Sequence, residues 1–179
     1  PLRLAQATAI FLSAATAGAN LSVSFFTIPR LLESPTPLML RQWARLYASG
    51  KATMPAFAGA ASLAYFFLAY HSQRVASSSS KLYLLAGAAS VGIVPYTLAL
   101  MERTNRRLLK KTADAQGMRM SEELVEVGPR EEGAKYLVDR WATLNLGRAA
   151  LSAVAAGVGL YVVLGGFELR GGGLMLRLI

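Results

Sequence analysis

The chain has 179 residues, of which 54% are hydrophobic and only 16% are charged, and its mean hydropathy is +0.38. Soluble domains usually carry about 25% charged residues, so this composition favours a membrane protein. The sequence has no cysteine and one histidine, which excludes disulfides, thiolate chemistry, and metal or haem sites built from several histidines.

Four long apolar runs predict membrane-spanning helices at residues 4–28, 53–70, 82–101 and 144–164. Each run is close to the roughly 20 residues that a helix needs to cross about 30 Å of hydrocarbon. The pattern predicts an all-α, four-transmembrane-helix bundle that forms a single integral membrane domain over residues 1–179. A very apolar soluble four-helix bundle is the alternative, but the fourth run lacks the polar face of a soluble helix. A signal peptide is the alternative for the first run, which stays apolar past the usual length of such a segment.

The first loop is predicted to contain a turn and then an amphipathic helix. We expect Pro29 to end the first helix, and Pro35 with Pro37 to form a rigid turn. The segment LMLRQWARLYAS at 38–49 places apolar and basic residues at helical spacing. It predicts an interfacial amphipathic helix that Gly50 caps.

The loops and helix ends of the second half of the chain can also be predicted. Four serines at 77–80 predict a short flexible outer turn. The third helix is expected to continue past the membrane, because NRRLLKKTADAQ at 105–116 is good helix-forming sequence. We expect an irregular hairpin at 117–129, re-entry into the fourth helix from 131, and a flexible tail at the glycines 171–173.

The net charge of +9 is distributed as in a multi-pass membrane protein rather than a nucleic-acid-binding protein. Thirteen Lys and Arg residues lie in the two long loops, 29–53 and 102–143, against five on the opposite side. Because basic loops tend to stay in the cytoplasm, we predict that both long loops are cytoplasmic. We expect a multi-pass endomembrane protein, of the endoplasmic reticulum, whose surroundings are membrane lipid and which binds no nucleic acid.

Polar side chains gather at the cytoplasmic end of the predicted bundle. Trp141, Asn145 and Arg148 are spaced i, i+4 and i+7, so they share one face of the fourth helix. Polar groups at such a position are costly in lipid and tend to face a partner or a cavity. We expect one polar cavity, roofed by the amphipathic helix, to which the other segments contribute Asn20, Trp43, Tyr47, Tyr96, Glu102 and Asn105.

Ordinary structural roles would also explain these residues. Arg148 could snorkel to the lipid headgroups, the aromatic residues could be interfacial anchors, and Asn20 could form only a helix-bridging hydrogen bond, worth roughly 1 kcal/mol. His71 follows the second span, on the outer side. It would lie roughly 27 Å from the cavity, at 1.5 Å per residue over about 18 residues, and is not expected to share the site.

Two segments of the chain resemble a known family. PYTLALMERTNRRLL at 95–109 is similar to the P-Y-T … M … T-N … L segment of the DUF1772 family, and WATLNLGRAALSA at 141–153 resembles its W-x-x-x-N-x-x-R segment. The S-x-S-x-x-x-x-P stretch at 22–29 and the spacing of residues 47, 50 and 55 also fit. The characterised fungal members of this family are anthrone oxygenases.

The resemblance implies a cofactor-independent monooxygenase without a metal, which oxidises a polyketide anthrone, for example emodin anthrone, with O2 to the anthraquinone. Its partners would be the flat aromatic substrate and O2, and homo-oligomerisation stays open. In this interpretation Arg148 stabilises the enolate oxygen, and Asn145 and Asn105 supply neutral hydrogen bonds to the enolate or peroxide. Trp141 and Tyr96 stack on the substrate rings.

The general base is left open among Glu102, Asp139, Tyr96 and water. Glu102 and Arg103 stand where the family more often has a small residue and proline. The alternative function is a non-enzymatic four-helix membrane module that binds a lipid, a quinone-like molecule or a partner subunit. A small transporter would need a polar path through both leaflets, and the outer half of the chain offers almost none.

Overall fold

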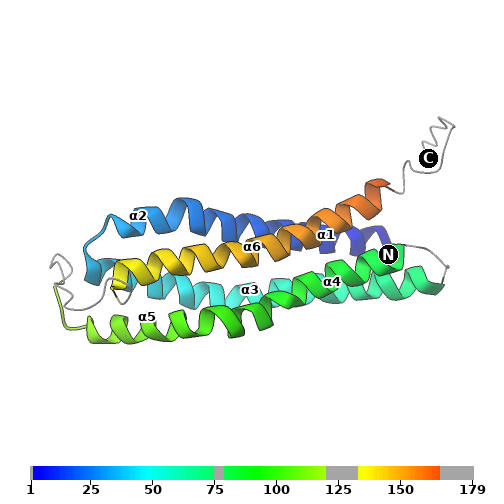
Figure 1. Cartoon of the computed structure of the whole chain (residues 1–179). Helices are drawn as coiled ribbons and strands as arrows, with labels where there is room; N and C mark the ends of the chain where they lie inside the picture. Colours follow the sequence, from blue (N-terminus) through cyan, green and yellow to red (C-terminus); the bar gives the residue numbers. More distant parts are fainter. Residues whose placement is uncertain (1, 75–78, 120–132, 166–179) are drawn as a thin grey trace.

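Four long helical segments run alongside one another in a single bundle, and each is long and apolar enough to cross a membrane (Figure 1). The computed structural model describes residues 2–74, 79–119 and 133–165. The four segments are Leu2–Leu32, Thr36–Gln73, Ser79–Asp114 and Ala134–Leu164. The regular elements of the described part are all helical, which confirms the predicted all-α, four-helix membrane protein.

The first segment consists of α1 (Leu2–Ser22), a π-helical turn (Val23–Thr27) and α2 (Ile28–Leu32). The prediction that Pro29 ends this helix is therefore wrong. Proline lacks an N–H group, and its ring presses on the carbonyl four residues earlier. The wider π turn, in which the Ile28 N–H bonds the Val23 carbonyl, ends two residues before Pro29, so the helix widens where the proline ring would otherwise crowd it.

The second segment is one helix, α3 (Thr36–Arg74), which is 39 residues long. The separate interfacial helix over 38–49 and its Gly50 cap are therefore wrong predictions, since α3 continues through Gly50 and Pro55. Met39, Leu40 and Trp43 are fully buried in the protein. The apolar face of this stretch packs on the other helices instead of lying on lipid, so the stretch aligns with the bundle.

The third segment consists of α4 (Ser79–Tyr96), a second π-helical turn (Thr97–Met101) and α5 (Glu102–Asp114), and the fourth is α6 (Ala134–Gly165). The predicted continuation of the third helix is confirmed as far as Asp114. The last two serines of the predicted outer turn belong to α4 instead, where the Ser80 hydroxyl donates to the Ala69 carbonyl at 3.0 Å. Residues 77–78, 120–132 and 171–173, which hold the rest of the predicted loops, lie outside the described residues.

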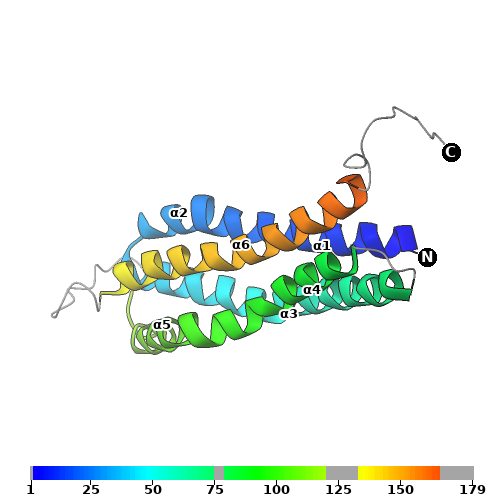
Figure 2. The same ribbon diagram turned by 45° about the vertical axis from the view of Figure 1, so that its right-hand side comes forward.

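Two apolar clusters divide the bundle along its length. The first lies toward the end where α2, α5 and the start of α6 meet, here called the α5 end (Figure 2). It is built on Trp43, Leu108 and Trp141, and the second cluster, at the opposite end, is built on Tyr65, Leu68 and Tyr83. Between the clusters the interior becomes polar, with Asn20 and Asn145 both buried. This polar level positions the candidate site.

Candidate functional site

A cavity of about 560 Å³ lies at this polar level, and all four segments contribute to its wall. Its lining is mostly apolar. Seven of the ten residues that the sequence predicted for the site line it: Asn20, Tyr47, Glu102, Asn105, Trp141, Asn145 and Arg148. Trp43, Tyr96 and Asp139 do not line it. Helical spacing along α6 and the antiparallel arrangement of the segments explain why residues from such distant positions meet here.

Arg148 is a partly buried arginine without a carboxylate partner among the described residues. Its Nε is buried and makes no hydrogen bond there. Glu102, which also lines the cavity, pairs with Arg106 instead, through Oε1 and Nε at 2.7 Å. Buried charges are normally paired, so a guanidinium left without an acid in a mostly apolar cavity is suited to bind an anionic group.

The side chain of Asn145 is held in one orientation by hydrogen bonds to the first segment. It is only 1% exposed, and its Nδ2 donates to the Asn20 carbonyl at 2.9 Å and to the Ser24 hydroxyl at 3.0 Å. The Ser24 hydroxyl in turn donates to the Ala142 carbonyl at 3.0 Å. Both amide N–H groups are thus engaged inside the protein, so in this conformation Asn145 has no donor left for a substrate.

Asn105 and Trp141 form a second interhelical contact on the cavity wall. The indole Nε1 of Trp141 donates to Oδ1 of Asn105 at 3.0 Å. This bond engages the oxygen of Asn105, whose Nδ2 has no partner among the described residues. Asn105 lines the cavity, and its amide N–H groups, unlike those of Asn145, are not engaged by another described residue.

An aromatic stack supports the wall from behind. Tyr47 lines the cavity and stacks on Trp43, with the ring centroids 5.2 Å apart and the ring planes 13° apart. Trp43 is fully buried and meets the ring of Trp141 edge to face at 6.0 Å. Trp43 thus acts in this structure as a support for two cavity-lining aromatic rings, and not as part of the lining.

Tyr96 and Asp139 take positions that the sequence did not predict. The Tyr96 hydroxyl donates to the Leu144 carbonyl at 2.8 Å, and its ring packs against Gly147 of α6. Asp139 is exposed on α6. Among the described residues, Glu102 is consequently the carboxylate in the cavity wall.

Both π-helical turns lie beside the cavity, where Val23 comes from the first turn and Thr97 with Leu98 from the second. Such turns are frequent at functional sites. Sequence reasoning missed both of them. Pro29 was the available signal for the first turn, and Pro95, two residues before the second, gave no indication of its type. Ser24, in the first turn, belongs to the S-x-S-x-x-x-x-P stretch at 22–29 and lies four residues after Asn20, but it was not among the predicted site residues.

Comparison with known proteins places this arrangement in a family. The model of the family described as anthrone oxygenase matches residues 43–158. This chain belongs to the anthrone oxygenase family. It is 34% identical over 168 residues to an anthrone oxygenase of Claviceps purpurea, which covers 92% of this chain and 89% of the relative. It is 31% identical over 159 residues to the anthrone oxygenase AgnL2 of Paecilomyces divaricatus, covering 87% of this chain and 92% of the relative.

No solved structure gives a significant match to this anthrone oxygenase family member. The matched region of the chain includes Tyr47, Glu102, Asn105, Trp141, Asn145 and Arg148, but it begins after Asn20 and Ser24. The cavity wall supplied by the first segment thus lies outside the part that the family model covers.

Within the described residues, no group of three or more His, Asp or Glu side chains could hold a metal ion.

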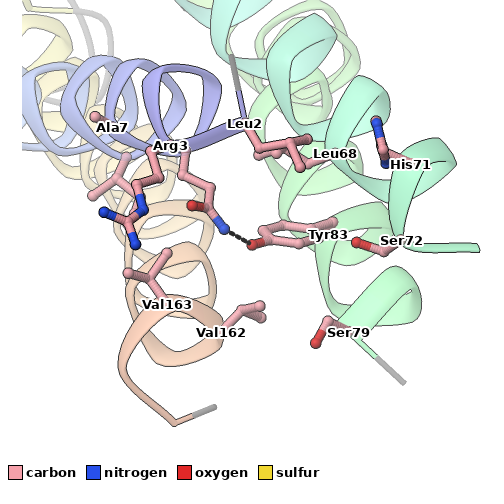
Figure 3. A pocket seen from close by; sticks show the side chains of 12 residues that line it. Leu2, Arg3, Ala7, Leu68, His71, Ser72, Ser79, Tyr83, Val162 and Val163 are labelled. Carbon is pink, nitrogen blue, oxygen red and sulfur yellow. Dashed lines mark hydrogen bonds between the residues drawn. The ribbon is translucent and has the colours of Figure 1, made fainter. Parts of the chain in front are cut away.

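A second cavity, of about 670 Å³, lies at the opposite end of the bundle (Figure 3). Arg3, His71 and Tyr83 are among its lining residues, and the Gln6 amide donates to the Tyr83 hydroxyl at 2.8 Å. His71 therefore lies at the far end from Arg148, as the sequence predicted. Arg148 and the three asparagines Asn20, Asn105 and Asn145 line the first cavity, which is the candidate active site of this family member.

Proposed function

We propose that this protein is a cofactor-independent anthrone oxygenase that oxidises a flat polyketide anthrone with O2 to the anthraquinone in the cavity around Arg148. Its relatives are named anthrone oxygenases. The observation that carries the proposal is the guanidinium of Arg148, which has no carboxylate partner in the described part of the chain and lines a mostly apolar cavity of about 560 Å³. A cavity of this size is within the usual range for a small-molecule site.

The first step is removal of a proton from the substrate. An anthrone has a methylene group para to the carbonyl of its central ring, and its deprotonation gives an enolate whose negative charge rests largely on oxygen. Arg148 would hold that oxygen, because a fixed donor in a low-dielectric site stabilises developing charge strongly. We assign the base to Glu102. Arg106 donates a hydrogen bond to Oε1 of Glu102, so the other carboxylate oxygen of Glu102 would accept the substrate proton.

The second step is the reaction of the enolate with O2. The enolate transfers one electron to O2, and the resulting carbon radical and superoxide combine to form the C–O bond of a peroxide anion. Protonation gives the hydroperoxide. Loss of the second methylene proton, with cleavage of the O–O bond, then yields the new carbonyl and one molecule of water. Asn105 would be the neutral donor to the enolate or peroxide, because it lines the cavity and uses its Oδ1, and not its Nδ2, in the bond to Trp141.

The aromatic wall would bind the ring system. Tyr47 and Trp141 come from different helices, and Trp43 fixes both rings. Flat aromatic ligands pack well against such rings in offset or edge-to-face geometry. Asn20 would contribute to this wall at the first segment, where its carbonyl also holds Asn145.

The deciding experiment measures O2 uptake and anthraquinone formation by purified, metal-stripped protein supplied with an anthrone in air. The rate should exceed the spontaneous oxidation of the anthrone and should scale with protein concentration. Binding of the anthrone without any acceleration would instead favour a non-enzymatic module, and the proposed reaction would be wrong.

We further propose that the chain forms a single integral membrane domain in the endoplasmic reticulum, with both long loops in the cytoplasm. The support is the excess of basic residues in those two loops, thirteen against five on the other side. In this orientation the α5 end and its cavity face the cytoplasm. Single cysteines at the two ends of the bundle, labelled from one side of the membrane, test the orientation.

A further inference from the structure

The helix α3 and the third segment are joined at two levels. Toward the opposite end, the Ser62 hydroxyl donates to the Gly87 carbonyl at 3.0 Å. Toward the α5 end, the Thr112 hydroxyl of α5 donates to the Leu40 carbonyl at 3.5 Å, and the Arg41 guanidinium donates to the carbonyl of Met118, which follows α5, at 2.8 Å. The two segments are thus fixed relative to each other above and below the cavity.

Between these two levels the segments separate. The π turn Thr97–Met101 packs on its flanking helices and on α6, while α3 packs mainly on α4 and α1 and, to a smaller extent, on α5. Residues on both sides of this separation line the cavity, namely Met54 and Pro55 of α3 and Thr97 and Leu98 of the π turn. The cavity therefore opens sideways, between two helices that cross the membrane.

The edge of this opening changes from apolar to charged along the bundle axis. Leu98 is 64% exposed and Val94 is 43% exposed, although both line the cavity. Toward the α5 end the edge becomes charged, with Lys51 on α3 and the Glu102–Arg106 ion pair on α5. This sequence of groups matches the boundary between hydrocarbon and headgroups, where exposed apolar side chains face acyl chains and charged ones face water.

We infer that this opening, which we call the lateral window, admits the substrate from the membrane leaflet instead of from the aqueous phase. This inference rests on the proposed function for the identity of the substrate. A flat, mostly apolar polyketide with polar oxygens partitions to the same boundary region that the edge of the window spans. A backbone carbonyl also becomes available at this edge. Pro55 has no N–H group, so the carbonyl of Lys51 lacks the donor that would normally lie four residues later in the helix.

The window can be tested with single cysteines, because the chain contains none of its own. Leu98→Cys would be labelled with a bulky, membrane-permeant maleimide in reconstituted protein, and anthrone oxidation compared before and after labelling. The matched control is Leu85→Cys, which is 51% exposed on the same segment but lies away from the cavity. We expect labelling to reduce the rate at least tenfold for Leu98→Cys and to leave that of Leu85→Cys within twofold.

A second readout does not depend on catalysis. The chain has two tryptophans, so Trp43→Phe leaves Trp141, on the cavity wall, as the only indole. In vesicles of phosphatidylcholine with dibrominated acyl chains, lipid access through the window should quench Trp141 emission, and labelling of Leu98→Cys should relieve that quenching at least twofold.

The two readouts separate the inference from the proposed function. If the wild-type protein fails to oxidise anthrones while the relief of quenching is observed, the proposed function is wrong and the window stands. If labelling of Leu98→Cys changes neither the rate nor the quenching, or if Leu85→Cys responds equally, the lateral window is wrong.

Discussion

Arg148 and Asn145 share one face of α6, but they differ in which of their donor groups are engaged within the protein. The guanidinium of Arg148 has no acid partner among the described residues, whereas the amide of Asn145 is engaged by Asn20 and Ser24. A residue with free donors can act on a ligand, and a residue whose donors are engaged holds helices in place. At the residue scale, substitutions should therefore separate catalysis from stability.

Arg148→Ala should lower kcat/KM for an anthrone about a hundredfold, equivalent to roughly 3 kcal/mol of transition-state stabilisation, as for the loss of one oxyanion donor. Arg148→Lys keeps the charge but loses the planar fork, so its rate should lie in between. Steady-state O2 uptake measures both. His71→Ala, in the other cavity, is the control. Near-normal turnover by Arg148→Ala, with loss of turnover in His71→Ala, would place the active site at the wrong end of the bundle.

Asn145→Ala should mainly destabilise the fold. It removes two buried hydrogen bonds between α6 and the first segment, and interhelical bonds in membrane proteins are worth about 0.6–1.7 kcal/mol each. We expect a loss of about 1–3 kcal/mol in unfolding from mixed micelles, with a smaller loss of kcat than for Arg148→Ala. Ser24→Ala should reproduce part of the loss, and the effects of the two substitutions should be less than additive. Full additivity would show that the two side chains are not coupled.

At the scale of the element, the close contact between α4 and α6 sets the position of Arg148 relative to the other helices. A Cβ atom added to Gly147 would overlap the hydroxyl and ring of Tyr96, whose hydroxyl bonds the Leu144 carbonyl. Gly147 directly precedes Arg148, so any shift of α6 at this contact moves the guanidinium. The absence of a side chain at Gly147 is thus part of how the cavity is assembled.

Gly147→Ala should destabilise the bundle by about 1–3 kcal/mol, as overpacking of a filled interior does, and should lower activity by displacing Arg148. Gly157→Ala is the matched control on the same helix, because a Cβ atom there meets nothing within 4 Å. That variant should be neutral or slightly stabilised, since alanine is the better helix former. Thermal unfolding in detergent, with O2 uptake, compares the two variants. Equal effects would mean that the Tyr96 contact does not matter.

At the scale of the whole molecule, orientation follows from the basic loops. Cysteines placed at Lys81, at the start of α4, and at Gln116, just after α5, are both on exposed positions. An impermeant maleimide added to sealed microsomes, whose outer face is cytoplasmic, should label Gln116→Cys and not Lys81→Cys. Permeabilisation should make both accessible. The reverse labelling pattern would overturn the proposed topology.

The expectation that the enzyme needs no cofactor is also argued from the composition of the whole chain. With no cysteine and one histidine, at the opposite end from Arg148, the sequence offers few soft or nitrogen ligands for a redox metal. Activity should survive dialysis against chelators, and the purified protein should show no flavin or haem absorbance. A stoichiometric redox metal whose removal abolishes activity, and whose return restores it, would contradict the prediction.

The number of spans could be predicted from the sequence, and seven of the ten residues predicted for the site do line the cavity. Hydropathy depends on the composition of one segment, and helical spacing by itself puts Trp141, Asn145 and Arg148 on one face of α6. The alternation of the spans then brings Asn20 and Asn105 to the same end of the bundle. These inferences succeeded because each follows from the geometry of one helix or from the order of the spans.

Tertiary structure alone decided which hydrogen bonds these side chains make. Asn145 and Asn20 are 125 positions apart, and no local pattern shows that the Asn145 amide uses both donors on the first segment. The direction of Tyr96, the continuity of α3 through Gly50, and the separation of α3 from the second π turn are likewise set by packing between segments. Sequence periodicity determines which face of a helix is polar, but the neighbouring helices determine which atoms on that face remain free for a substrate.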